Sequence, residues 1–240
     1  MKIYKIDSKG KVRILEITTS NGNLIQTSGL LDGKKVEHTK LCKPKNIGKV
    51  NETTDITQSE SEADALVVKK LREGYFKTIE EAKSVKVILP MLAQDYFKKE
   101  KKVQFPCYAQ PKLDGMRGLG NMGTLTSRAN KEIITLKHIQ ADLDGIEQHI
   151  DGELYAHGLT FQENMKIIKK YREGQTENVK YHVYDMISDK PFIERYSELK
   201  TIVKGKPNIE VVPLVEISNP WVLEEYYGNM MLAGYEGVML

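Results

Sequence analysis

The stretch YAQPKLDGMRG, residues 108–118, is the most informative part of this chain. It places Lys112 and Arg117 on either side of Gly115. An isolated lysine amine, with a pKa of about 10.4, is almost fully protonated at neutral pH. A neighbouring cation or a bound metal favours the neutral form, which can attack phosphorus. Glycine permits a turn that can point both side chains at one ligand. The stretch therefore predicts a nucleophilic lysine, and a plain surface turn is the alternative.

Four further motifs follow this stretch in order. They are TSRANKE (126–132), IDGELYAHG (150–158), YHVYDMI (181–187) and YEGVML (235–240). Each pattern is weak by itself, but their combined order and spacing form a strong signal. The set resembles the lysine-dependent nucleotidyltransferases and, within them, the ATP-dependent DNA ligases.

The resemblance implies an α+β fold over residues 87–240, a nucleotidyltransferase (ATP-grasp-like) adenylation domain with mixed and antiparallel sheets around a cleft. Alternating strand and helix patterns independently indicate an α+β or mixed-sheet domain. The predicted strands are 103–113, 116–121, 150–156, 179–187 and 209–215. The predicted helices are 90–97, started by Pro90, and 136–149, 160–172, 191–204 and 221–232.

Residues 1–80 predict a small β-rich accessory domain that precedes the adenylation domain. Three short strands, IYKI, KVRILEITT and LIQTSG, are separated by turn-forming residues. A basic loop at 41–53 and a charged helix at 57–71, stopped near Gly74, complete the pattern. This arrangement faintly resembles WGR-like modules, which implies nucleic-acid binding, but the Trp-Gly-Arg tripeptide is absent and the only tryptophan is Trp221.

Composition narrows the class of protein. Of the 240 residues, 40% are hydrophobic and 29% charged, as in ordinary globular proteins. Two cysteines are too few for a disulfide framework, and no secretory leader or membrane-spanning run is visible, so a cytoplasmic protein is expected. Residues 1–102 contain 21 Lys and Arg against 14 Asp and Glu. This excess of positive charge suits phosphate binding, and a surface that merely keeps the protein in solution is the alternative.

The resemblance implies a reaction in three steps that uses ATP. Lys112 attacks the α-phosphorus, expels pyrophosphate and holds AMP as a phosphoramidate. The AMP passes to a 5′-phosphate in nicked double-stranded DNA, and the adjacent 3′-hydroxyl displaces it, in replication, repair or recombination. Each step builds negative charge at phosphorus, so the site needs cations more than acid–base groups.

Two arginines are the predicted phosphate contacts. By resemblance, Arg117 contacts the ribose and phosphate of the nucleotide, and Arg128 orients the 5′-phosphate of the nick. The guanidinium fork of donors suits both tasks, although either could form only a surface salt bridge. The family usually has glycine two residues after this second arginine, whereas this chain has Asn130, which also tolerates left-handed backbone.

The remaining predicted site residues bind the nucleotide and its metal. By resemblance, Glu153 accepts a hydrogen bond from ribose, and Tyr184 stacks on adenine, with a core tyrosine as the alternative. Gln110 reads the adenine amino group. Glu236 helps to hold Mg2+, a hard cation that prefers carboxylate and phosphate oxygens.

Other functions remain open at this point. RNA-capping guanylyltransferases share the K-x-D-G-x-R motif, and RNA ligases, which usually lack the arginine, are a further alternative. A non-catalytic nucleic-acid-binding fragment is a third. The sequence stops at Leu240, before the lysine pair and OB-fold that the family carries. We therefore expect a truncated piece of a longer, monomeric ligase, and expect residues 1–240 alone to adenylylate slowly or not at all.

Overall fold

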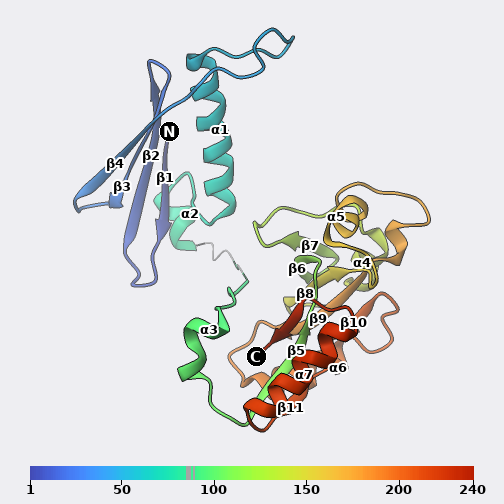
Figure 1. Cartoon of the computed structure of the whole chain (residues 1–240). Coiled ribbons are helices and arrows are strands. Elements are labelled where there is room, and N and C mark those ends of the chain that lie inside the picture. Colours follow the sequence, from blue (N-terminus) through green and yellow to red (C-terminus); the bar gives the residue numbers. More distant parts are fainter. Residues whose placement is uncertain (85–87, 89) are drawn as a thin grey trace. The chain divides into compact units, whose positions relative to one another are not determined.

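The computed structural model describes residues 1–84, 88 and 90–240. The chain forms two compact units, Met1–Leu89 and Pro90–Leu240, called unit 1 and unit 2 (Figure 1). The boundary predicted at residue 87 lies outside the described residues. Among the described residues, no helix has the length and apolar character needed to cross a membrane.

Unit 1 is an antiparallel sheet with one long helix packed on it. Its strands lie in the order β1-β2-β3-β4. The elements are β1 (Lys2–Ile6), β2 (Val12–Ser20), β3 (Asn23–Leu30), β4 (Lys35–Leu41), α1 (Asp55–Arg72) and α2 (Ile79–Ser84). Ile3, Leu15, Ile17 and Leu24 form a buried core against α1. The first three strands confirm the prediction, whereas β4 was not predicted because its sequence KVEHTKL is polar and largely exposed at the sheet edge.

The long helix of unit 1 begins slightly earlier than predicted. The Thr54 side chain accepts a hydrogen bond from the Thr57 backbone, and the Thr57 side chain caps Thr54 in return. This capping box satisfies backbone donors that a helix start otherwise leaves unpaired. Beyond the helix end, Gly74 adopts φ = 87°, a conformation that favours glycine, so the predicted stop is confirmed.

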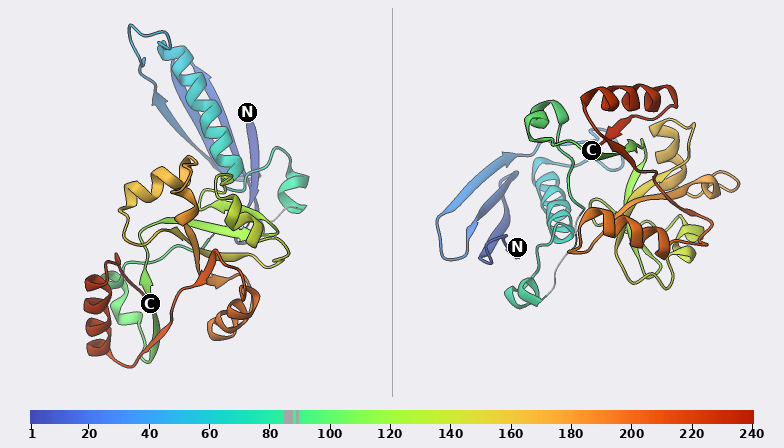
Figure 2. Two further views of the ribbon diagram at one scale, coloured as in Figure 1. Left: turned by 90° about the vertical axis from the view of Figure 1, so that its right-hand side faces the viewer. Right: turned by 90° about the horizontal axis from the view of Figure 1, so that it is seen from below.

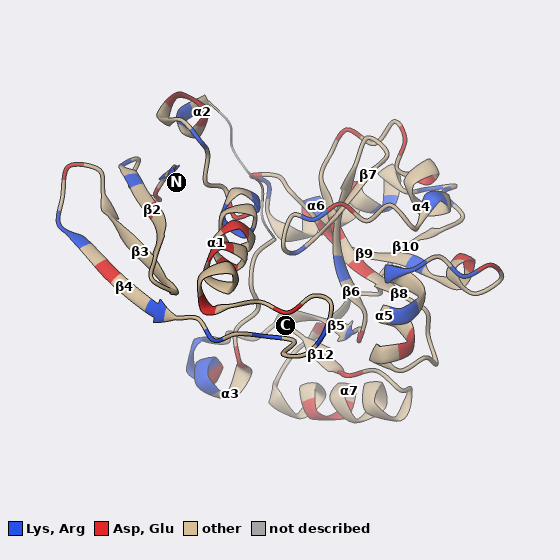
Figure 3. Ribbon diagram, turned by 90° about the horizontal axis from the view of Figure 1, so that it is seen from above, with Lys and Arg blue, Asp and Glu red and all other residues tan. Residues whose placement is uncertain are grey.

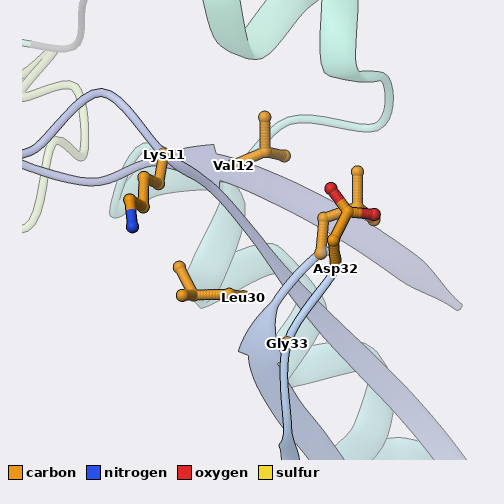
Figure 4. Close-up of a pocket in the computed structure, with 6 residues that line it drawn as sticks. Lys11, Val12, Leu30, Asp32 and Gly33 are labelled. Carbon is orange, nitrogen blue, oxygen red and sulfur yellow. The ribbon is translucent and has the colours of Figure 1, made fainter.

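Figure 4 shows a pocket in unit 1, at the beginning of β2 and the turn between β3 and β4. Its lining residues are Lys11, Val12, Leu30, Leu31, Asp32 and Gly33. All of the motifs described above lie in unit 2 instead. The pocket is therefore not part of the candidate site.

Unit 2 contains two sheets and confirms the expected α+β fold with mixed and antiparallel sheets. One sheet has the order β10-β9-β8-β6-β7, and the other β11-β5-β12. Only the β10–β9 pair is parallel among the described pairings. The strands are β5 (Cys107–Lys112), β6 (Met116–Asn121), β7 (Thr124–Ser127), β8 (Ile150–Tyr155), β9 (Lys180–Met186), β10 (Ile209–Val211), β11 (Val215–Ile217) and β12 (Gly237–Met239).

Helices cover one face of the five-stranded sheet (Figure 2). The α-helices are α3 (Tyr96–Lys99), α4 (Lys137–Asp142), α5 (Phe161–Lys169), α6 (Phe192–Ile202) and α7 (Pro220–Leu232), and short 3-10 turns lie at Glu100–Lys102 and Thr176–Asn178. Side chains from α4, α5 and α6 lie in one buried cluster with Ile150 and Leu154 of β8. Because side chains alternate along a strand, Asp151 and Glu153 point to the opposite face.

Several predicted elements were wrong in their bounds. The strand expected at 103–113 begins only at Cys107, and the helix expected at 160–172 ends at Lys169. The helix expected from Pro90 is α3, which starts only at Tyr96, because the Asp95 side chain caps the Phe97 backbone. The helix expected at 136–149 ends at Asp142, ahead of a turn in which Gly145 has φ = 77°. The strand expected at 209–215 is divided between β10 and β11, which belong to different sheets.

Candidate active site

The predicted nucleophile ends β5 and is followed by a tight turn into β6. A Cβ atom on Gly115 would lie 2.3 Å from the Leu154 carbonyl oxygen. No other residue fits there without a shift of the backbone, because real Cβ atoms do not approach so closely. The glycine thus lets the turn lie directly against β8, which carries Glu153.

Lys112 and Glu236, predicted as nucleophile and metal ligand, are brought together. Their side chains form an ion pair. The Glu236 backbone donates to the Lys112 carbonyl at 3.0 Å, and Gly237 of β12 stands opposite Lys112 in the strand register. Both side chains remain partly exposed, at 39% and 44%, so a ligand can reach the pair.

Arg117 is held in place by the carboxylate of Asp151, a residue for which the sequence analysis predicted no role. Its Nε donates to Asp151 Oδ1 at 3.0 Å and its Nη2 to Oδ2 at 2.6 Å, while Nη1 donates to the Met91 carbonyl at 2.5 Å. Burial is the largest single influence and lowers the pKa of Arg117, but the hydrogen bonds with Asp151 and the nearby Tyr184, Asp151 and Glu153 together raise that pKa above its usual value. Asp151 stands two residues before Glu153 in one strand, and this spacing could have placed it on the site face.

Tyr184 joins the same cluster. The Arg117 guanidinium carbon lies 5.7 Å from the centre of its ring, and its hydroxyl donates to Asp151 Oδ1 at 3.4 Å. Burial, and then the Asp151 carboxylate, raise the pKa of Tyr184 well above its usual range. The buried core tyrosine of this strand is Tyr181, whereas Tyr184 is only partly buried and faces the site.

Glu153 lies among these charged groups, and the pKa of its carboxyl group is unusually high. Burial raises its pKa from 4.5 to about 8, opposed by Arg117 and Lys112 and reinforced by Asp151 and Glu236. The Glu153 carboxyl group is therefore mostly protonated, and so neutral, at pH 7. A neutral carboxyl group donates one hydrogen bond as well as accepting others, so Glu153 can do more than the acceptor role predicted for it.

Two predicted residues lie at the edges of the cluster. Gln110 is two residues before Lys112 in β5 and so shares its face, and its Nε2 approaches the Val212 carbonyl at 3.5 Å. Arg128 directly follows β7, whose Ser127 pairs with Gly118 of β6, and its side chain is exposed rather than part of the cluster. Asn130 does adopt the left-handed conformation, with φ = 52°.

Removing Asp151 tests its hold on Arg117. Asp151→Ala leaves a half-buried guanidinium unpaired and is expected to destabilise the chain by about 3 kcal/mol in urea unfolding. Asp185→Ala is the matched control, because Asp185 binds Arg195 in the same two-pronged way, at 2.8 Å for each bond, on the same strand as Tyr184. Both variants lose stability, but only Asp151→Ala is expected to weaken ATP binding. Equal ATP affinity in the two would contradict a site role for Asp151.

Residues 90–240 are similar to known proteins in sequence and in fold. The sequence model of the ATP-dependent DNA ligase domain matches residues 90–240. A structure from a study of Lig E DNA ligases has a TM-score of 0.57 at 24% identity, over 63% of this chain and 60% of that one. A structure named Pmar-Lig_Pre has a TM-score of 0.55 at 22% identity, over 62% and 41%. The chain therefore spans less than two thirds of either protein, and the likeness shows the fold of unit 2. No curated protein matches the chain.

Proposed function

This chain belongs to the ATP-dependent DNA ligase family through residues 90–240, and from that premise we propose that it seals nicks in double-stranded DNA by way of a lysyl-AMP intermediate. One observation carries the proposal: Lys112, Glu153 and Glu236 lie close together. They come from three separate motifs and from two sheets. A nucleophile, a ribose-binding carboxyl group and a metal-binding carboxylate are the groups that adenylyl transfer requires.

In the first step the neutral Lys112 amine attacks the α-phosphorus of ATP. An N–P bond forms, the bond from the α-phosphorus to the pyrophosphate oxygen breaks, and the amine proton is lost to solvent. Glu236 would hold Mg2+ together with phosphate oxygens, which fits this site because Mg2+ is commonly bound by one or two carboxylates plus substrate phosphates. The metal would supply charge neutralisation at the phosphates. A Glu236 carboxylate engaged in this way would no longer pair with Lys112, which would free the amine.

The groups around Lys112 bind and orient the nucleotide. Arg117, held in place by Asp151, donates to ribose and phosphate oxygens. Tyr184 offers its ring to adenine, and Glu153 exchanges hydrogen bonds with the ribose hydroxyls. Gln110, on the face of β5 that carries Lys112, reads the adenine edge.

The second and third steps act on DNA. Arg128 orients the 5′-phosphate that receives AMP from Lys112, and the 3′-hydroxyl then forms the phosphodiester bond and releases AMP. The free state of Cys42 and Cys107 is consistent with a reducing, cytoplasmic setting for replication or repair. We propose that the protein acts as a monomer on each nick.

Covalent labelling tests this function. The purified chain is incubated for hours with Mg2+ and α-labelled ATP or GTP, and is then separated by denaturing electrophoresis. We expect slow labelling from ATP, over the hours of the incubation, and release of the label with sealing of the nick when nicked DNA is added. Label from GTP alone would indicate capping chemistry instead, and a label that persists in Lys112→Ala would exclude Lys112 as the nucleophile.

For residues 1–80 we propose a nucleic-acid-binding accessory role. The loop between β4 and α1 is ordered by its own hydrogen bonds, such as the 3.0 Å bond from the Thr53 backbone to the Lys45 carbonyl. It exposes Ile47 and Val50 beside Lys43 and Lys49, which form no ion pair with any described residue. Lysines grouped in this way suit phosphate binding.

The double variant Lys43→Ala/Lys49→Ala tests this role. We expect its affinity for duplex DNA to fall about tenfold at 0.1 M salt, because two phosphate contacts are lost. Labelling of Lys112 by ATP is expected to stay unchanged, since these lysines lie in the other unit. Unchanged DNA affinity would remove the support for an accessory DNA-binding role of this loop.

A further inference from the structure

A short segment upstream of the nucleophile combines positive charge with exposed apolar side chains. Residues 91–102, called the upstream segment, contain α3 and the 3-10 turn Glu100–Lys102. Its lysines are Lys98, Lys99, Lys101 and Lys102, and all four are exposed. Figure 3 shows α3 largely in the blue of Lys and Arg. Lys98 pairs with Asp95 at 3.4 Å. The other three form no ion pair with any residue in the described part of the chain.

The apolar side chains of this segment are exposed to a degree that folding alone does not explain. Phe97 is 87% exposed and Met91 82%. The Tyr96 ring contacts the Phe97 ring edge-on, at a centroid distance of 5.6 Å and an angle of 75°. A ring that stands free beside unpaired lysines is a common element of nucleic-acid-binding surfaces, because it stacks on bases or sugars while the cations bind phosphates.

The upstream segment also lies against the candidate active site. The Met91 carbonyl accepts the 2.5 Å hydrogen bond from Arg117, so the beginning of the segment is joined to the nucleotide-binding cluster. Figures 1 and 2 show α3 beside the C-terminal end of the chain, where β12 pairs with the strand of Lys112. A polyanion bound at the segment would therefore pass close to the reacting groups.

We propose that the upstream segment is a DNA-backbone contact, in which Lys99, Lys101 and Lys102 bind phosphates of the duplex next to the nick and Phe97 packs on the sugar–base surface. The inference rests on the proposed function in one respect, because it takes the substrate to be DNA. It adds a surface outside the residues that handle ATP. Neutralising three phosphates contributes about 2.7 to the slope of log affinity against log salt.

A matched pair of triple variants in the full chain tests the proposal. Lys99→Ala/Lys101→Ala/Lys102→Ala removes the surface. Lys166→Ala/Lys169→Ala/Lys170→Ala removes three exposed lysines from α5 and from the residue that follows it. Binding of a labelled nicked duplex is measured by fluorescence anisotropy between 0.05 and 0.2 M salt, a range of about fourfold in ionic strength.

The first triple variant is expected to bind about 10- to 100-fold more weakly at 0.1 M salt and to lose about 2 to 3 from the salt slope, while the α5 variant changes neither. Phe97→Ala is expected to weaken binding with an unchanged salt slope, because it removes no charge. Equal losses in both triple variants, or none in the first, would overturn the proposal.

Labelling by ATP separates this proposal from the one on which it rests. Lys99→Ala/Lys101→Ala/Lys102→Ala leaves the nucleotide-binding groups in place, so covalent AMP on Lys112 is expected at the wild-type rate. If the wild-type chain is labelled but both triple variants bind DNA equally well, the segment is not the contact and the ligase function stands. If the wild-type chain neither forms lysyl-AMP nor binds nicked DNA, both proposals fail.

Discussion

Lys112→Arg is expected to reduce formation of covalent AMP by more than about 1,000-fold. Arginine cannot lose its proton at any pH the protein survives, so it has no lone pair with which to attack phosphorus. The substitution keeps the positive charge, and with it a partner for Glu236. The loss would therefore report nucleophilicity rather than a change of charge. Label incorporation from ATP in a single turnover measures it.

The control for this variant is another ion-paired lysine of unit 2. Lys180 on β9 pairs with Glu210 and is exposed to a similar extent, at 43% against 39% for Lys112. Lys180→Arg is expected to label at the wild-type rate. Both variants are expected to keep the wild-type unfolding midpoint. Nick sealing from ATP that survived Lys112→Arg would refute the lysyl-AMP mechanism, whereas sealing of DNA that already carries a 5′-adenylyl group is compatible with it.

Glu153→Gln is expected to remove a large pH dependence of stability. The pKa of Glu153 is raised by burial to about 8 in the folded chain, from 4.5. Between these values the folded state holds a proton that the unfolded state has lost, so stability falls as the pH rises, and the loss is complete above pH 8. Each pKa unit corresponds to about 1.4 kcal/mol, so the effect is on the order of several kcal/mol.

Urea unfolding at pH 5 and pH 9 measures this effect. The wild-type chain is expected to lose more stability than Glu153→Gln between the two values, because glutamine has the shape of the neutral carboxyl group but does not ionise. ATP affinity is expected to fall through pH 8 in the wild type and to stay level in the variant. Parallel stability curves for the two proteins would show that Glu153 is ionised in the folded state at neutral pH.

The motifs correctly grouped residues that the structure brings together, such as Lys112 and Glu236, whereas the bounds of several elements around them were wrong. The roles assigned to these residues stay predictions. The residues of β8 alternate regularly, so its motif places Asp151 and Glu153 on one face. The ladder between β8 and β9 changes register between Asp151 and Gly152 and leaves Tyr184 without a partner on β8, which the motif in β9 does not reveal. The role of Asp151 was not predicted, because its bonds with Arg117 depend on the register that sets Arg117 opposite Glu153. Register between strands distant in the sequence follows from the packing of the whole sheet, which a local pattern does not contain.

The wrong helix at Pro90 has a similar cause. Proline favours the first turn of a helix, and local preference alone suggested one there. In the structure the Met91 carbonyl instead accepts a hydrogen bond from the Arg117 side chain, a contact with a residue far along the chain. Asp95 then supplies a better helix start a few residues later. Tertiary contacts with the site thus outweigh the local preference.

The pairing of Lys112 with Glu236 also bears on selectivity toward small reactive molecules in the cell. A cell contains many electrophiles, among them acyl phosphates and aldehydes, that modify free amines. An amine that is protonated and occupied by a carboxylate is a poor target for them, because attack requires a lone pair. Under the proposed mechanism, Mg2+ with its nucleotide would draw Glu236 away and leave the amine able to attack, so Lys112 would react less with such electrophiles between turnovers.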